Sequence, residues 1–179
     1  PSEKKVAESF ERQFSGCRQR IIVTTFASNA FRLQSLLTVA HKFGRKVAVT
    51  GRSMENILKV STELGYLKIP NNTLVDINTI KQLPKHKICI VSTGSQGENM
   101  SALYRMAFSE HRQVEIQAGD RVIISASAIP GNERHELAEG VAVVEREIGG
   151  HQRQQRMPHA VWNNEVFTKR DLVIQREVG

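Results

Sequence analysis

The amino-acid sequence predicts an α/β protein with a Rossmann-like, mainly parallel sheet that is flanked by helices. Two observations carry this prediction. Short apolar runs rich in β-branched residues recur along the chain, and amphipathic segments of helical length separate most of them. Strands that alternate with helices of this length need right-handed crossover connections, which place the strands parallel to one another. With 179 residues, 40% of them hydrophobic, the chain is long enough to bury an ordinary core.

The first elements are predicted from apolar spacing and from residues that end helices. A helix is expected over residues 3–15, closed by Gly16, because three apolar residues recur among charges at helical spacing: Val6, Phe10 and Phe14. Residues 20–26 (RIIVTTF) predict a buried strand. Either Ser28 or Asn29 is expected to cap the second helix, which Gly44 stops.

The same alternation continues along the chain. Ser53 is expected to cap a helix that runs through Leu64, and a further helix is expected around residues 100–108. Four further strands are predicted, at residues 46–50, 87–93, 112–116 and 121–127. A turn at Gly119–Asp120 is expected between the last two of these strands.

Four loops follow the carboxyl ends of predicted strands, and they are rich in Gly, Ser and Asn: residues 27–29, 51–53, 94–98 and 127–132. In a parallel sheet such loops converge on one edge, where ligands bind. Small residues let phosphate oxygens approach backbone N–H groups, and helix N-termini add donors. These residues also serve any tight turn or N-cap, so a phosphate-binding edge and ordinary turns are both open at this point.

Composition narrows the classes of partner. The formal net charge of +7 favours a polyanion, although many basic proteins bind no nucleic acid. No apolar run is long enough to cross a bilayer and the first residues are not signal-like, so we expect a cytoplasmic protein with no membrane partner. Cys17, Cys89 and the six histidines lack the spacing of metal ligands, and neither a P-loop nor a dinucleotide fingerprint is present.

Five segments together resemble the β-CASP region of bacterial ribonuclease J, in that family's order: residues 20–34, 44–56, 74–84, 90–107 and 119–133. The string TGSQGE, followed by M-S-A-L-x-R-M-A, is the most distinctive of the matching motifs. The resemblance covers residues 1 to about 133. It therefore predicts a β-CASP RNA-binding domain over 1–133 and a divergent tail over 134–179.

The resemblance implies a domain inserted into a metallo-β-lactamase fold, the two forming a zinc-dependent nuclease that cleaves RNA from the 5′ end or internally. The implied partners are single-stranded RNA and the metallo-β-lactamase domain, and homo-oligomers through regions outside this sequence are left open. Glu3 would match an acidic residue that orients a metal-site group. The implied RNA path comprises Ser28, Asn29, Arg32, Arg52, Ser53, Gly94, Ser95, Gln96, Ser125 and Ser127.

Three departures from the family pattern limit these expectations. The H-x-H-x-D-H metal motif is absent, so no cofactor is expected in this chain, in contrast to zinc in the full-length family, and the chain alone is not expected to cleave RNA. Phe31 stands where histidine is expected, and Asn99 stands where proline is expected. Residues 134–179 do not align, so we expect a partly disordered, frameshifted or substituted tail, in which residues 141–148 and 171–178 form a helix or an edge strand.

Three functions are compatible with the sequence. The first is the RNA-binding portion of a zinc-dependent ribonuclease. The second is a Rossmann-like module that binds a small phosphate ligand or a nucleotide through the same loops, and the third is a non-catalytic interaction fragment. RNA binding predicts affinity that grows with oligonucleotide length and falls with salt, whereas a mononucleotide pocket predicts neither.

Overall fold

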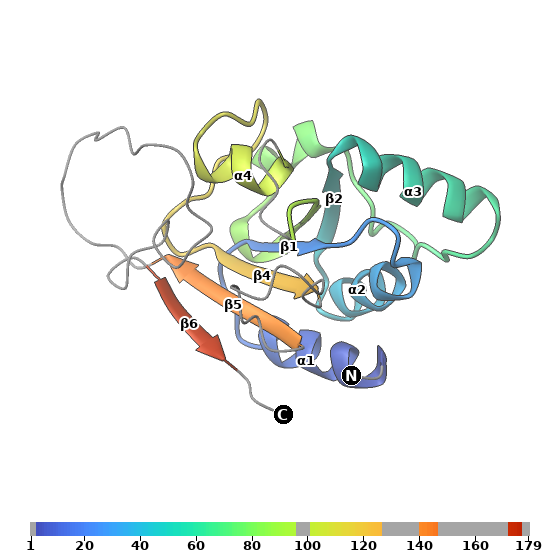
Figure 1. Cartoon of the computed structure of the whole chain (residues 1–179), viewed down its shortest axis with the longest axis horizontal. Helices are drawn as coiled ribbons and strands as arrows, with labels where there is room; N and C mark the ends of the chain where they lie inside the picture. The colour runs from blue at the N-terminus through green and yellow to red at the C-terminus, as the bar shows by residue number, and fades with distance from the viewer. Residues whose placement is uncertain (1–2, 96–100, 127–139, 147–171, 177–179) are drawn as a thin grey trace, which may run out of the picture.

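The computed structural model describes residues 3–95, 101–126, 140–146 and 172–176 (Figure 1). These residues form one sheet with the strand order β2-β3-β1-β4-β5-β6. The strands are β1 (Ile21–Thr25), β2 (Lys46–Thr50), β3 (Ile88–Ser92), β4 (Arg121–Ala126), β5 (Gly140–Arg146) and β6 (Leu172–Arg176). The helices are α1 (Glu3–Phe14), α2 (Ala30–Lys42), α3 (Arg52–Glu63) and α4 (Ala102–Ala107), with the 3-10 helices η1 (Ile77–Gln82) and η2 (Lys85–Lys87).

The first four strands of the sheet order, from β2 to β4, are all parallel, which confirms the predicted α/β class. β5 and β6 extend this sheet in antiparallel fashion beyond β4. They overlap with the two tail segments, 141–148 and 171–178, for which either a helix or an edge strand was expected. Both segments form strands. None of the helices in the described ranges is long and apolar enough to span a membrane.

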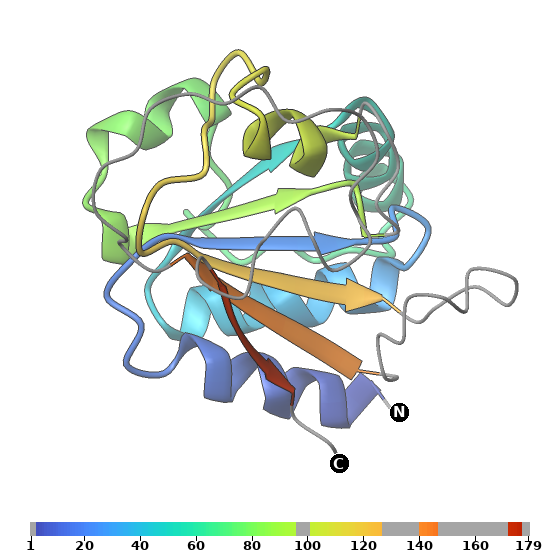
Figure 2. The same ribbon diagram turned by 60° about the vertical axis from the view of Figure 1, so that its left-hand side comes forward.

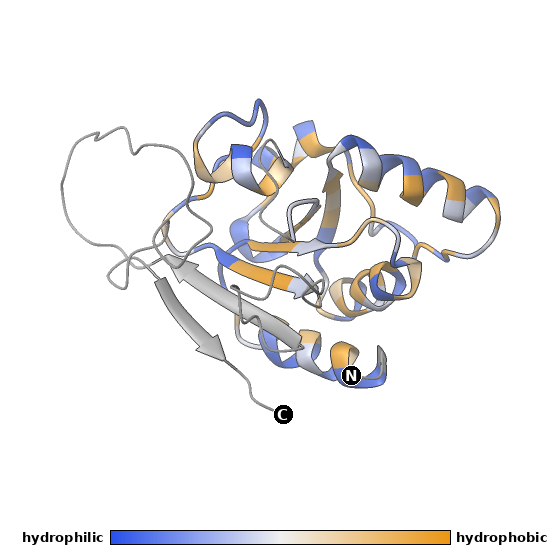
Figure 3. Cartoon of the chain, in the orientation of Figure 1, coloured by the Kyte–Doolittle hydropathy of each residue, from blue (hydrophilic) through white to orange (hydrophobic). Residues whose placement is uncertain are grey.

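The two faces of the sheet bury separate apolar cores because successive strand residues point to opposite sides. In β1, Ile21 and Val23 belong to the core shared with α1, α2 and α3, whereas Ile22 belongs to the core shared with α4 and η1. Figure 2 shows α1 and α2 beneath the sheet and α4 above it. Figure 3 shows the apolar residues concentrated in the strands and alternating with polar residues along the helices, as the amphipathic spacing predicted.

Most predicted elements are confirmed to within one or two residues, and Asn29 rather than Ser28 caps α2. The predicted cap at Ser53 is wrong. α3 begins at Arg52 and its cap is Gly51, two residues before the predicted cap, with a φ of 103° that a residue with a side chain rarely adopts. In the sequence GRS, Gly51 is therefore the cap, and Arg52 and Ser53 lie in the first turn of α3.

The strand predicted at residues 112–116 is also wrong, and the reason lies in its backbone hydrogen bonds. Val114 and Ile116 are buried alternately, as in a strand, but they pack in the core on the α4 side of the sheet. The backbone N–H of Ile116 donates to the carbonyl of Met106, and the carbonyl of Glu115 accepts from the side chain of Arg20. Side chains and the end of α4 thus satisfy the backbone hydrogen-bonding groups that a neighbouring strand would otherwise satisfy.

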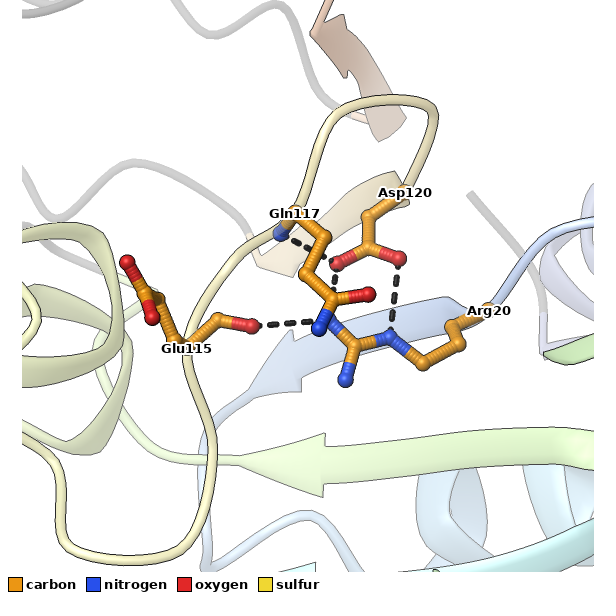
Figure 4. Close-up of polar contacts among 4 residues, drawn as sticks. All are labelled: Arg20, Glu115, Gln117 and Asp120. Carbon is orange, nitrogen blue, oxygen red and sulfur yellow. Dashed lines mark hydrogen bonds and ion pairs between the residues drawn. The ribbon is translucent and has the colours of Figure 1, made fainter. Parts of the chain in front are cut away.

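Buried arginines hold the edge of the sheet at which the parallel strands begin, here called the amino edge. Arg20, next to the start of β1, pairs with the fully buried carboxylate of Asp120, next to the start of β4 (Figure 4). Arg45, next to the start of β2, donates to three backbone carbonyls. The hydrogen-bond donors of these two arginines are therefore used inside the fold.

Candidate nucleic-acid interface

Three of the four loops predicted to form a phosphate-binding edge begin at one edge of the sheet, and the fourth, residues 127–132, lies outside the described residues. β2, β3 and β1 are neighbours that run parallel, so their carboxyl ends, and the loops with Arg52, Ser95 and Ser28 that follow them, lie along one edge of the sheet, here called the carboxyl edge (Figure 2). Two of these loops pack closely: a Cβ added to Gly51 would lie 2.9 Å from Oγ1 of Thr93. The loops after β2 and β3 therefore lie in close contact at the carboxyl edge.

The start of α2 contributes one exposed and two inward-facing polar residues. Ser28 is exposed in the turn after β1. The Asn29 side chain accepts a hydrogen bond from the backbone N–H of Arg32 at 3.0 Å, so its carbonyl oxygen acts as the N-cap. Arg32 is only 7% exposed, and its Nη1 donates to the backbone carbonyl of Ser125 at 3.4 Å. Arg32 thus ties α2 to the end of β4 rather than projecting into solvent.

The start of α3 contributes two exposed donors. Arg52 and Ser53 occupy the first turn, and both side chains are exposed. Gly51 precedes them without a side-chain cap. The first backbone N–H groups of a helix have no partner within that helix, and the helix dipole favours negative charge there. An exposed guanidinium and hydroxyl beside such a helix start are suited to bind a phosphate group.

Gly94, after β3, is required by its surroundings. Its φ is 111°, and a Cβ at this position would lie 2.5 Å from Oγ of Ser101, the residue that caps α4. Any side chain there would displace the start of α4. Ser95 follows and is buried, so the structure places both residues in the edge but beneath its surface.

A row of three buried hydroxyls crosses the carboxyl edge, which sequence reasoning missed. Thr50, Ser92 and Thr24 are register partners on the adjacent strands β2, β3 and β1. They point to the α4 side of the sheet, whereas Thr25 and its register partner Ser125 point to the α2 side. Within the part of the chain that the structure describes, the hydroxyls of Thr24 and Ser92 have no hydrogen-bond partner. A sequence signal does exist, since β1, β2 and β3 each end in a hydroxyl residue.

His111 holds one end of this row. The backbone N–H groups of Gln113 and Val114 point at Nδ1 at 3.3 and 3.2 Å, so Nδ1 accepts and the proton of the neutral ring lies on Nε2. Nε2 then donates to Oγ1 of Thr50 at 2.9 Å, which leaves the hydroxyl proton of Thr50 pointing away from the ring.

The environment of His111 makes folding stability depend on pH. Burial lowers the pKa of His111 below its ordinary value, and the Arg105 charge lowers it further, against an opposing effect of Glu55. The unfolded chain therefore binds the proton first, at about pH 6.5, and stability contributed by the neutral ring is lost as the pH falls from that value towards the folded pKa. We expect the free energy of unfolding, measured by urea titration, to fall between about pH 6.5 and 5 by more in the wild type than in His111→Gln.

Substitution of His86, an exposed residue of η2, provides the matched control. His86→Gln should follow the wild-type pH dependence. Parallel curves for the wild type and His111→Gln across this pH range would show that His111 does not hold a neutral ring in the fold.

The remaining predicted site residues lie in different parts of the chain. Glu3 is the first residue of α1, whose start lies on the side towards which the parallel strands point (Figure 2). Gln96, Asn99 and Ser127 lie outside the described residues. Across residues 3–95, 101–126 and the two short tail strands, no group of three or more His, Cys, Asp or Glu side chains is arranged to hold a metal ion. Cys89 lies in the core, where burial raises the pKa of its thiol to about 12, so it is inert at neutral pH.

Comparison with known proteins gives a family. The model of the ribonuclease J β-CASP domain matches residues 18–139. The chain is 48% identical over 133 residues to ribonuclease J of Helicobacter pylori, 47% identical over 133 residues to that of Thermus thermophilus, and 41% identical over 148 residues to that of Corynebacterium glutamicum. These alignments cover 74%, 74% and 83% of this chain but only 19%, 23% and 20% of the relatives, so the chain spans about a fifth of their length. The chain belongs to the ribonuclease J β-CASP domain family.

Proposed function

We propose that this chain binds single-stranded RNA along its carboxyl edge, as the RNA-gripping part of a zinc-dependent ribonuclease that acts in the cytoplasm. The observation that carries the proposal is the convergence of three strand-end loops on that edge, with Ser28 and Arg52 exposed at the starts of α2 and α3. Membership of the ribonuclease J family makes RNA the polyanion to consider first.

The edge offers donors of the kind that a sugar-phosphate chain needs. The backbone N–H groups at the starts of α2 and α3 would face successive phosphates, and the guanidinium of Arg52 would add a charged contact. Arg32 would act indirectly, by holding α2 against the end of β4 through the carbonyl of Ser125. A surface that combines backbone donors with one or two cations binds RNA without reading its sequence.

Hydrolysis is assigned to a different part of the complete enzyme. The described residues do not fit a zinc ion, because they offer no cluster of three metal-binding side chains. A bound zinc ion would supply an activated water at neutral pH. We propose that the metal ligands come from a metallo-β-lactamase domain, which this chain contacts at the carboxyl edge, and that this chain alone holds RNA without cleaving it.

Arg52→Ala tests the proposal directly. We expect it to weaken binding of a single-stranded oligoribonucleotide by about fivefold and to reduce the slope of log affinity against log salt by about 0.7, because one phosphate contact is lost. The measurement is fluorescence anisotropy at several salt concentrations. Arg18→Ala is the matched control, since Arg18 is also exposed but precedes β1 at the opposite, amino edge.

The outcome separates the proposed function from its alternatives. Equal loss in Arg18→Ala and Arg52→Ala would mean that net charge, and not the carboxyl edge, drives binding. Affinity that does not change between a mononucleotide and a ten-residue oligonucleotide would favour a pocket for one small phosphate ligand. No binding at low salt would favour a non-catalytic interaction fragment.

A further inference from the structure

We infer that Phe31 forms a base-stacking subsite at the carboxyl edge, on which one nucleobase of the bound strand lies flat. This inference rests on the proposed function and deepens it, since it assigns one contact to a base and not to the phosphate backbone. A stacking contact accepts any base, because every base has a π face.

Phe31 is the most exposed large hydrophobic side chain in the part of the chain that the structure describes, at 78%. It is the second residue of α2, directly after the capped start of that helix. Helical side chains tilt towards the N-terminus of their helix. The ring of Phe31 is therefore directed towards the turn that carries Ser28 and Asn29, at the same edge as the proposed phosphate contacts.

The fold itself does not use this ring. Its neighbours Arg32 and Leu33 are buried, and Ala27 and Ala30 pack against the core on the α2 side of the sheet, but Phe31 belongs to neither core. A phenylalanine side chain stabilises a fold by being buried, and a ring that is 78% exposed contributes little in this way. The ring of Phe31 is therefore available to contact a ligand.

The surroundings favour a nucleobase over a protein surface. Phe31 is the strongly exposed apolar side chain of α2, whereas the other two, Leu64 and Tyr66, follow the end of α3. The core of a protein interface needs a contiguous apolar area made of several side chains. A single aromatic ring beside hydroxyl and amide groups and two helix starts matches single-stranded RNA, which combines bases for stacking with phosphates for hydrogen bonding.

The test compares two ligands of equal length and charge: a ten-residue oligoadenylate and the same backbone built from stable abasic ribose residues. The wild-type chain of 179 residues should prefer the base-bearing ligand. Phe31→Ala should weaken binding of oligoadenylate by about tenfold and leave binding of the abasic ligand unchanged, since only the stacked base is lost. Phe31→Trp should retain the preference, because the larger ring preserves the π surface.

Tyr66→Ala is the matched control, because Tyr66 is an aromatic residue with 75% exposure that follows the far end of α3. It should change neither affinity. If Phe31→Ala lost affinity equally for both ligands, the inference would be overturned, because the ring would then act on the backbone or on the fold. An unchanged affinity for oligoadenylate in Phe31→Ala would overturn it as well. If the wild type bound the abasic ligand but Phe31→Ala changed neither affinity, the proposed function would survive without the inference. If the wild type bound neither ligand, the proposed function and the inference would both fall.

Discussion

Asp120→Ala is expected to lower the free energy of unfolding by about 3–5 kcal/mol, because it leaves the guanidinium of Arg20 buried without its counter-charge. Arg20 Nε donates to Oδ1 of Asp120 at 2.9 Å, and Nη2 pairs with Oδ2 of the same carboxylate (Figure 4). The lost carboxylate also accepts from the backbone N–H of Gln117 at 2.7 Å. Urea titration of the purified chain measures the effect.

Three further variants make this prediction sharp. Asp120→Asn keeps the shape and one acceptor, so it should cost less than Asp120→Ala. The double variant Arg20→Met/Asp120→Leu should recover most of the loss, since it removes the unpaired charge as well. Glu11→Ala breaks the exposed pair between Glu11 and Lys42 and should cost at most about 1 kcal/mol. A loss in Asp120→Ala no larger than that in Glu11→Ala would show that the buried pair is not structural.

The contact between Arg20 and Asp120 also holds a connection that reaches the proposed interface. Residues 109–120 link α4 to β4. His111 attaches the beginning of this connection to Thr50 at the carboxyl edge, and Arg20 attaches its end through Glu115 and Asp120 at the amino edge. Loosening the Arg20 end is therefore expected to free the segment that positions the hydroxyl of Thr50.

Arg45→Met is expected to destabilise the fold by a similar amount, about 3–5 kcal/mol. Nη1 of Arg45 donates to the carbonyls of Gln19 at 3.0 Å and Ile88 at 2.8 Å, and Nη2 donates to the carbonyl of Cys17 at 2.6 Å. The guanidinium also lies 5.7 Å from the ring centre of Phe14. Removing it takes a side-chain donor away from each of these three backbone carbonyls. Thermal and urea unfolding would both report the loss.

The controls for Arg45 test geometry against charge. Desolvation lowers the pKa of Arg45, but an arginine remains protonated at neutral pH, so Arg45→Lys preserves the charge while losing the planar fork. It should be less stable than the wild type but more stable than Arg45→Met. Arg18→Met, an exposed change near the same edge, should alter stability by no more than about 0.5 kcal/mol. Equal stability of Arg45→Lys and the wild type would show that charge alone is sufficient.

Three buried arginines change how the net charge of the chain is interpreted. The formal charge of +7 predicted a polyanion partner, but Arg20, Arg32 and Arg45 are buried, and each donates to backbone carbonyls inside the molecule. Their charge still contributes to the long-range field, but their donors are already used. The proposed contact with RNA would therefore depend on exposed cations such as Arg52, which is why the effect of a single substitution there should be measurable.

By itself, the sequence determined the elements and the family. Apolar residues at helical spacing predicted α1, and β-branched runs predicted β1 to β4, because these periodicities depend only on neighbouring residues. The convergence of the strand-end loops followed from parallel topology alone. The string TGSQGE and the segment that follows it indicated the ribonuclease J family, which the match to the family model over residues 18–139 confirms.

The tertiary structure alone decided which polar groups meet. Thr50 and His111 are 61 residues apart, and Arg20 and Asp120 are 100 residues apart, so no local pattern joins them. The strand at 112–116 was predicted wrongly because its alternating apolar residues are compatible with any extended segment over a core, and only the three-dimensional packing shows that side chains satisfy its backbone. The direction of a polar side chain at a strand end depends on register and on what covers each face, and both are set by long-range packing of the whole sheet.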